Sequence, residues 1–290
     1  MLHVHNFSYG LLTPALAYLM SFLGSFLGLR CTSRSRASTG SSRVRWLLLA
    51  AVSIGITGIW VMHFIAMLGF SIPGETITYN VPVTLLSMLL AVVFVLFGLL
   101  ISGLGKPTFR TLLTGGVITG LGVAAMHYTG MAAMRMPAGM SYNPVVFALS
   151  VLIAIVAATA ALWAALWLGG FWSALGAAAI MGVAVSGMHY TGMAAMRVWT
   201  PHGSMPMGGA GATSFLLPLI VGVSVTTFVL TATIALSPTA AEMSEEAELM
   251  RKIESARTGG GMASANGNGL RPVPADPDAN PNFTRSTLQQ

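Results

Sequence analysis

The chain has 290 residues, of which 54% are hydrophobic and only 8% are charged. So little charge cannot cover the surface of a water-soluble domain, and the composition therefore indicates a membrane protein. The formal net charge is +6, but the arginines cluster beside apolar segments, which favours a role in membrane topology over nucleic-acid binding. The single cysteine, Cys31, excludes a disulfide framework.

Seven apolar segments are each long enough to cross a bilayer, which takes roughly 20 residues. In chain order they cover approximately 9–29, 46–68, 82–103, 111–134, 145–168, 171–196 and 214–236. Only helices satisfy every backbone polar group in lipid at these lengths. The sequence therefore predicts an all-α membrane protein, a bundle of seven transmembrane helices.

The orientation of the bundle follows from the basic residues between the spans. The first and third connections hold seven of them: Arg30, Arg34, Arg36, Arg43, Arg45, Lys106 and Arg110. The connections on the other side hold Glu75 and two basic residues, Arg135 and Arg197. We therefore expect the N-terminus outside and the C-terminus in the cytoplasm.

The chain is expected to divide into three parts. Residues 1–236 form the membrane domain. Residues 237–257 form a short cytoplasmic helix, because acidic residues come early and basic ones late in this segment, which matches the helix dipole. Residues 258–290 are rich in Gly, Asn, Pro and Ser, a composition typical of a disordered tail.

One motif recurs three times in the spans. The sequence Met-His-Tyr-Thr-Gly-Met-Ala-Ala-Met-Arg occupies 126–135 and 188–197, and a looser copy, Met-His-Phe-Ile-Ala-Met, occupies 62–67. Two spans separate successive copies, so the fold is expected to contain three parallel two-helix repeats and a final helix. The histidines of the motif should then lie at the same depth, near the outer face.

The motif carries soft, metal-competent side chains on one helix face. A histidine at position i and a methionine at i+4 share a face, and in the two full copies the face extends to i+7. Gly130 and Gly192 lie between them, where a small residue lets a neighbouring helix approach. The candidate metal ligands are His63, Met67, Met126, His127, Met131, Met134, Met188, His189, Met193 and Met196, and Tyr128 and Tyr190 are candidates for binding a cofactor.

Two interpretations of these residues compete. A methionine stripe is ordinarily core packing, and an intramembrane histidine is often an interhelical hydrogen bond. Three ionisable residues at equivalent positions in the bilayer, each with the same methionine partner, favour ligation. Imidazole with thioether suits copper better than zinc, because no carboxylate or thiolate lies near, and haem is an alternative that has no independent sequence signal. One to three copper ions are expected, since the repeats can share a site or build one each.

The quartet Met126-His127-Tyr128-Thr129, repeated at Met188-His189-Tyr190-Thr191, resembles the signature of the MHYT family of bacterial integral-membrane sensor domains. The resemblance covers about residues 9–236. It implies a multi-pass protein of the bacterial cytoplasmic (inner) membrane that binds copper through Met and His and so detects oxygen, carbon monoxide or nitric oxide. The first copy departs from the signature, since Phe64 replaces the tyrosine.

Members of this family often carry a cyclic-di-GMP cyclase, phosphodiesterase or kinase domain after the membrane part, and we expect none in residues 237–290. The sequence therefore predicts a metal-binding sensor that is not itself an enzyme and signals through its tail to a separate protein. Its other expected partners are the lipid bilayer and a diatomic gas, with the oligomeric state open. The alternative is a copper-handling or transport protein, favoured by His202, Met205 and Met207 in the last outer loop.

Overall fold

The computed structural model describes residues 5–73, 75–105, 107–199 and 209–211, with scattered residues between 214 and 257. In these ranges six helices are long and apolar enough to cross a membrane: Leu12–Ala37, Gly40–Leu68, Val81–Gly103, Phe109–Ala132, Pro144–Trp167 and Phe171–Ala195. They coincide with the first six predicted spans, so the chain is a helical, multi-pass membrane protein. The seventh predicted span, 214–236, falls largely outside the described residues.

Local capping chemistry sets where the helices begin. The helices α4 (Val81–Gly103) and α6 (Pro144–Trp167) both start after an asparagine, and each has proline in its first turn. The Asn80 side chain accepts a hydrogen bond from the Val83 amide at 3.2 Å, and Asn143 accepts from the amide of Val145 at 3.0 Å. These bonds satisfy amides that have no partner inside the helix. The helix α5 (Phe109–Ala132) starts instead with a Thr108–Thr111 capping box.

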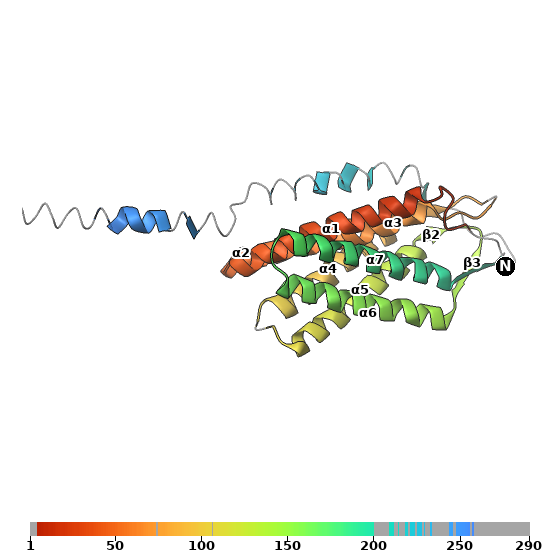
Figure 1. Ribbon diagram of the computed structural model, residues 1–290. Coiled ribbons are helices and arrows are strands. Elements are labelled where there is room, and N and C mark those ends of the chain that lie inside the picture. Colours follow the sequence, from red (N-terminus) through yellow and green to blue (C-terminus); the bar gives the residue numbers. More distant parts are fainter. Residues whose placement is uncertain are drawn as a thin grey trace, which may run out of the picture. The chain divides into compact units, whose positions relative to one another are not determined.

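Three inner helices carry the histidine motifs. The first is the continuous helix made of α2 (Gly40–Val52), the π-helix η1 (Ser53–Val61) and α3 (Met62–Leu68). The second is α5, and the third is α7 (Phe171–Ala195). An outer helix packs between inner helices that are successive in the chain. The helix α4 contacts both η1 and α5, and α6 contacts both α5 and α7. Figure 1 shows this group of helices running side by side.

The third outer position belongs to α1 (Leu12–Ala37), which packs against α7 and against α2, η1 and α3. Six helices thereby complete an approximate threefold arrangement of three inner and three outer helices. The sequence predicted three two-helix repeats followed by a final helix, so that each inner helix pairs with the outer helix before it. In the structure each inner helix contacts two outer helices, and α7 packs against both α6 and α1.

The helix α1 also runs to Ala37, beyond the predicted end of the first span at residue 29. Its last turns are stabilised by polar contacts that an apolar window cannot detect. The Arg36 guanidinium donates hydrogen bonds to the carbonyls of Ala165 at 2.7 Å and Leu168 at 2.5 Å, at the end of α6. Arg43 donates to the Gly103 carbonyl at the end of α4. These arginines satisfy carbonyls that helix ends leave without a partner.

Short strands connect the repeats at the opposite end of the bundle (Figure 1). The strand β1 (Thr78–Tyr79) pairs antiparallel with β2 (Met134–Arg135) and with β5 (Ala210–Gly211), and β3 (Gly139–Tyr142) pairs antiparallel with β4 (Met196–Trp199). The same bond recurs beside them: the Asn80 amide donates to the Ala133 carbonyl and the Asn143 amide to the Ala195 carbonyl, both at 2.8 Å. Each repeat is therefore tied by its backbone to the next one.

Residues 239–290 form a separate unit. The residues of the predicted tail helix that the structure describes, 244–245, 248–255 and 257, are helical. An exposed ion pair joins Lys252 Nζ to a Glu248 carboxylate oxygen at 2.9 Å, one helical turn apart. The division into three parts stays a prediction.

Glycine allows α1 to approach the inner helix η1 closely. A Cβ atom on Gly24 would overlap the backbone of Gly58. The Ser53 hydroxyl also donates to the Gly24 carbonyl at 2.9 Å across the same contact. Small residues at this crossing let the two backbones pack directly, the usual device for joining helices in lipid.

Gly24→Ala is therefore expected to destabilise the bundle by roughly 1–3 kcal/mol, because the obstacle is backbone rather than a movable side chain. The matched control is Gly176→Ala on α7, where an added Cβ meets nothing within 4 Å. Thermal unfolding of both variants in detergent, followed by circular dichroism, gives the comparison. Equal transition temperatures for the two variants would contradict the close α1–η1 contact.

Candidate metal centre

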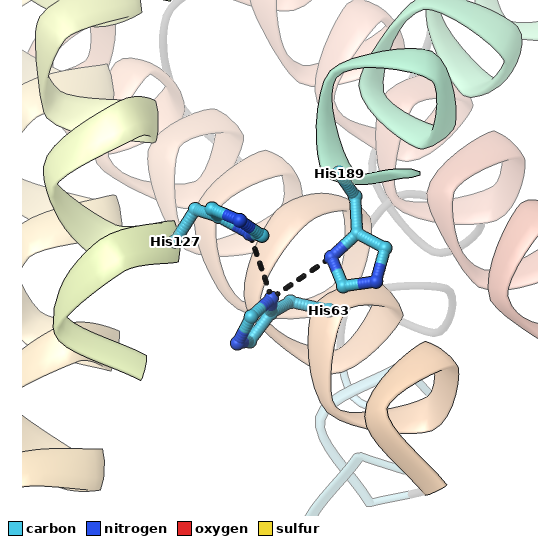
Figure 2. A group of neighbouring side chains, drawn as sticks. All are labelled: His63, His127 and His189. Atoms are coloured by element: carbon cyan, nitrogen blue, oxygen red, sulfur yellow. Dashed lines mark hydrogen bonds between the residues drawn. The ribbon is translucent and has the colours of Figure 1, made fainter. Parts of the chain in front are cut away.

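Three buried histidines meet where the inner helices converge. His63 comes from α3, His127 from α5 and His189 from α7, and their exposed fractions are 0%, 1% and 1%. The Nδ1 atom of His63 lies 3.0 Å from Nδ1 of His189 and 3.2 Å from Nδ1 of His127. Figure 2 shows the three rings turned toward one another from different helices. We call these three side chains the histidine cluster.

The cluster itself is close to threefold symmetric. The ring centroids are 4.9, 5.0 and 5.1 Å apart, and the ring planes make angles of 80°, 77° and 88°. Such similar values show that the three motifs present their imidazoles in the same way. The prediction that the histidines lie at one depth is consistent with this geometry, and the repeats meet at one shared site rather than at three.

Glycines determine which ring edge faces the centre. A Cβ atom on Gly130 would lie 2.5 Å from Nε2 of His63, and one on Gly192 would overlap Nε2 of His127. Each of these imidazoles therefore rests its Nε2 edge against the glycine of the next repeat and turns Nδ1 inward. The sequence assigned these glycines to close helix packing. The structure shows instead that they make room for histidine rings.

The Nδ1 atoms form a polar centre that hydrogen bonds alone satisfy poorly. In a neutral imidazole, Nδ1 is either a donor or an acceptor, so His63 Nδ1 cannot donate to one neighbour and accept from the other. The helices α1 to α7 contain no acidic residue that could balance a protonated ring. The three Nε2 atoms are buried and have no hydrogen-bond partner among the residues that the structure describes.

A metal ion fits this donor set. The ligand nitrogens of the cluster all lie within 4.8 Å of one another. Metal–imidazole bonds of about 2.0–2.1 Å in a trigonal or tetrahedral site hold the nitrogens roughly 3.3–3.6 Å apart. The observed 3.0 and 3.2 Å differ from that spacing by a few tenths of an ångström, which small ring rotations can supply. One cation at the centre would accept lone pairs from all three rings at once.

The first inner helix reaches the cluster through an irregular segment. The π-helix η1 spans Ser53–Val61 and ends directly before Met62 and His63. Its wider turns change the angular position of the side chains that follow, and such segments are frequent at functional sites. No π segment interrupts α5 or α7.

The candidate methionines are buried, but they divide into two groups. Met62, Met67, Met126, Met131, Met188 and Met193 lie on the inner helices, each at most 4% exposed. Met134 and Met196 lie in β2 and β4, because the helices end at Ala132 and Ala195 and the chain then pairs with the preceding repeat. The assumption that a helical face extends to i+7 is therefore wrong for these two. Ligation by any methionine stays a prediction.

The two candidate tyrosines differ in their hydroxyl contacts. Tyr128 shares a hydrogen bond of 2.6 Å with the Ser150 hydroxyl on α6. The Tyr190 hydroxyl is buried and has no hydrogen-bond partner in the described part of the chain, and its ring centroid lies 5.5 Å from that of Phe7. Phe64, at the same position in the first copy, has no hydroxyl, and its ring packs on Trp60 and Tyr79. A role of either tyrosine in cofactor binding stays a prediction.

Two further tyrosines, which the motif search did not single out, pack on the aromatic residues that follow His63 and His127. Tyr79 packs on Phe64 at 5.8 Å between ring centroids, and Tyr142 packs on Tyr128 at 5.2 Å. Burial raises the pKa of Tyr142 to about 12 and also raises the pKa of Tyr79, so both phenols stay neutral. The recurring pairs Tyr79-Asn80 and Tyr142-Asn143 are the sequence signal that could have revealed them.

The fold and the histidine cluster thus define a multi-pass helical membrane protein with a repeated internal unit. The model of the MHYT family, described as a bacterial signalling protein N-terminal repeat, matches residues 57–115, 120–178 and 182–249. The chain belongs to this family. Each matched repeat begins six or seven residues before its histidine, at 63, 127 or 189.

Several curated proteins resemble the chain. It is 42% identical over 209 residues to the bifunctional diguanylate cyclase/cyclic di-GMP phosphodiesterase MucR of Pseudomonas aeruginosa, covering 70% of this chain and 30% of that protein. It is 40% identical over 228 residues to the cyclic di-GMP phosphodiesterase NbdA of the same organism, covering 76% and 28%. An uncharacterized signaling protein of Caulobacter vibrioides is 33% identical over 211 residues, covering 71% and 25%. The chain thus spans less than a third of the length of these relatives. No solved structure matches it.

The glycine contacts give a test of the cluster geometry. Gly130→Ala and Gly192→Ala should each push a histidine ring off the centre, and we expect copper affinity to fall about 10–100-fold, the usual effect of disturbing the surroundings of a ligand. Gly187→Ala on α7 is the matched control, because an added Cβ there meets nothing within 4 Å. Copper titration against a competing chelator measures the three affinities. Wild-type affinity in both test variants would contradict the role of the glycines.

Proposed function

We propose that this chain is an integral-membrane sensor that binds one copper ion at the histidine cluster and reports a diatomic gas or a redox change to a separate signalling protein. The observation that carries the proposal is the convergence of Nδ1 from His63, His127 and His189 in a site lined by neutral residues. The proposal does not include a reaction catalysed by the membrane part.

The chemistry of the donors supports copper. Imidazole and thioether are the ligands that Cu(I) prefers, and a monovalent ion adds a single net charge to a membrane interior without acidic residues. Zinc sites usually gain a carboxylate or thiolate. The described spans hold no carboxylate, and their one thiol, Cys31, lies near the end of α1 away from the cluster. Buried methionines next to the histidines in the sequence, such as Met126 and Met188, are candidates for a fourth ligand.

The geometry favours a single ion over haem. A porphyrin needs a flat slot between its axial ligands. In the cluster, each pair of imidazoles meets edge to face with centroids 4.9 to 5.1 Å apart. The three rings occupy the space in which a macrocycle would lie. A metal-to-protein ratio near one is the corresponding expectation.

The relatives favour signalling over transport. The names of MucR and NbdA describe enzymes of cyclic di-GMP turnover, and the segment they share with this chain is the membrane repeat. A sensor must hold its metal, whereas a transporter must release it, and rings that are at most 1% exposed favour holding. The distribution of arginines supports insertion in the bacterial inner membrane with the cluster toward the periplasm.

Purified protein should contain one copper per chain after loading with Cu(I). His63→Ala, His127→Ala and His189→Ala should each lose most of it, because the remaining two imidazoles cannot complete the site. His5→Ala, outside the cluster, is the matched control and should bind copper as the wild type does. Copper content by atomic absorption checks this. Equal copper in the wild type and in a variant that combines all three substitutions would refute the proposal.

The sensor and transporter hypotheses separate in proteoliposomes. We expect copper to bind without crossing the membrane, so a lumenal copper indicator should show no flux above that of empty vesicles. The His63→Ala variant supplies the reference for nonspecific leak. A saturable flux that depends on His63 would favour the transport alternative.

A further inference from the structure

A small apolar cavity lies between the three inner helices and the helices α1 and α6. Its walls include Ile59, Val123 and Val185, each four residues before one of the three histidines. Residues at i and i+4 share a helix face, so these side chains point toward the same axis as the imidazoles. They lie about 6 Å further along it, since a helix rises 1.5 Å per residue. Met188, the neighbour of His189, also lines the cavity.

The wall on the outer side is made of alanine. Ala154 and Ala158 of α6 are 2% and 6% exposed and line the cavity together with two further alanines of the same helix. Larger residues at these positions would fill the space. Such larger residues occur on the exposed side of α6, at Leu152 and Val156. A larger side chain at one of these alanines would therefore occupy the cavity.

The lining excludes water and charged ligands. Ten of the twelve lining residues are apolar, and the other two are Ser25 and Thr119. The Thr119 hydroxyl donates to the Phe94 carbonyl on α4. A water molecule needs two to four polar partners, which such a site does not offer, and apolar cavities in proteins stay dry.

The volume limits the size of an occupant. The cavity measures about 40 Å³, more than the roughly 10–15 Å³ that one water needs and well below the roughly 150 Å³ of a cavity that holds benzene. It suits a molecule of two or three atoms. Uncharged molecules of this size dissolve in the hydrocarbon of a bilayer, so they can reach the cavity without crossing water.

We infer that this cavity is the binding site for the small uncharged molecule that the protein detects, and that it holds this molecule directly beside the histidine cluster. The inference rests on the proposed sensing function for its biological meaning. It assigns the ligand a place about one helical turn from the histidine cluster, in contact with Met188, the neighbour of His189. Occupancy of the cavity itself needs no metal.

Xenon is the probe, because it enters dry apolar cavities and does not coordinate copper. In metal-free protein, xenon should cause saturable shifts of the methyl NMR signals of Ile59, Val123 and Val185. Ala158→Leu should fill the cavity and weaken xenon binding by at least about tenfold, which corresponds to 1.4 kcal/mol. Ala160→Leu, the same substitution on an exposed position of α6, is the matched control and should change nothing.

The alternative outcomes are distinct. Shifts that grow without saturation, or that are equal in Ala158→Leu and Ala160→Leu, would overturn the inference. Val123→Ala enlarges the cavity and should strengthen xenon binding, which keeps the inference testable if Ala158→Leu fails to fold. Loss of copper binding with intact xenon binding would overturn only the proposed function.

A second measurement links the cavity to the cluster. Protein loaded with Cu(I) should give a carbon monoxide stretching band in the infrared. Ala158→Leu should keep its copper and lose this band, whereas Ala160→Leu should keep both. A full band in Ala158→Leu would show that carbon monoxide reaches the cluster by another route and would overturn the inference.

Discussion

The structure depends on one unusual constraint: three neutral imidazoles turn their Nδ1 edges toward a common point in an interior without acidic residues. Polar atoms buried in hydrocarbon are costly unless something satisfies them. The backbone cannot supply that partner, because each inner helix uses its own amides and carbonyls internally. The rings must therefore satisfy one another or share an ion, and either solution requires three parallel helices held in a fixed register.

Several contacts in different parts of the structure hold the three inner helices in this register. Gly130 and Gly192 let two of the rings rest against the next inner helix. The Asn80–Ala133 and Asn143–Ala195 bonds fix the height of successive repeats. At the far end, Arg36 and Arg43 join α1 and α2 to the carbonyl ends of α6 and α4. The helices are thus joined to one another by hydrogen bonds at both ends of the bundle.

The threefold arrangement is imperfect, and its departures concentrate in the first copy. That copy has Phe64 in place of tyrosine and Ala66 in place of the glycine at 130 and 192, and a π-helix precedes it. Its helix is also the most enclosed span, with 72% of its most apolar window buried, against 22–50% for the others. Apolar neighbours that enclose a side chain offer no partner for a hydroxyl, so phenylalanine suits position 64 better than tyrosine does.

Sequence patterns alone determined the class of this protein. Apolar length predicts six of the observed helices because the bilayer fixes how long a spanning helix must be, and the repeat spacing predicts that its histidines lie on parallel helices. Three features required the tertiary structure: the meeting of the rings at one point, the place of α1 as the third outer helix, and the cavity beside the cluster. These depend on how side chains such as Gly130 and Ala158 pack against other helices, and packing between segments distant in the chain leaves no periodic signal in the sequence.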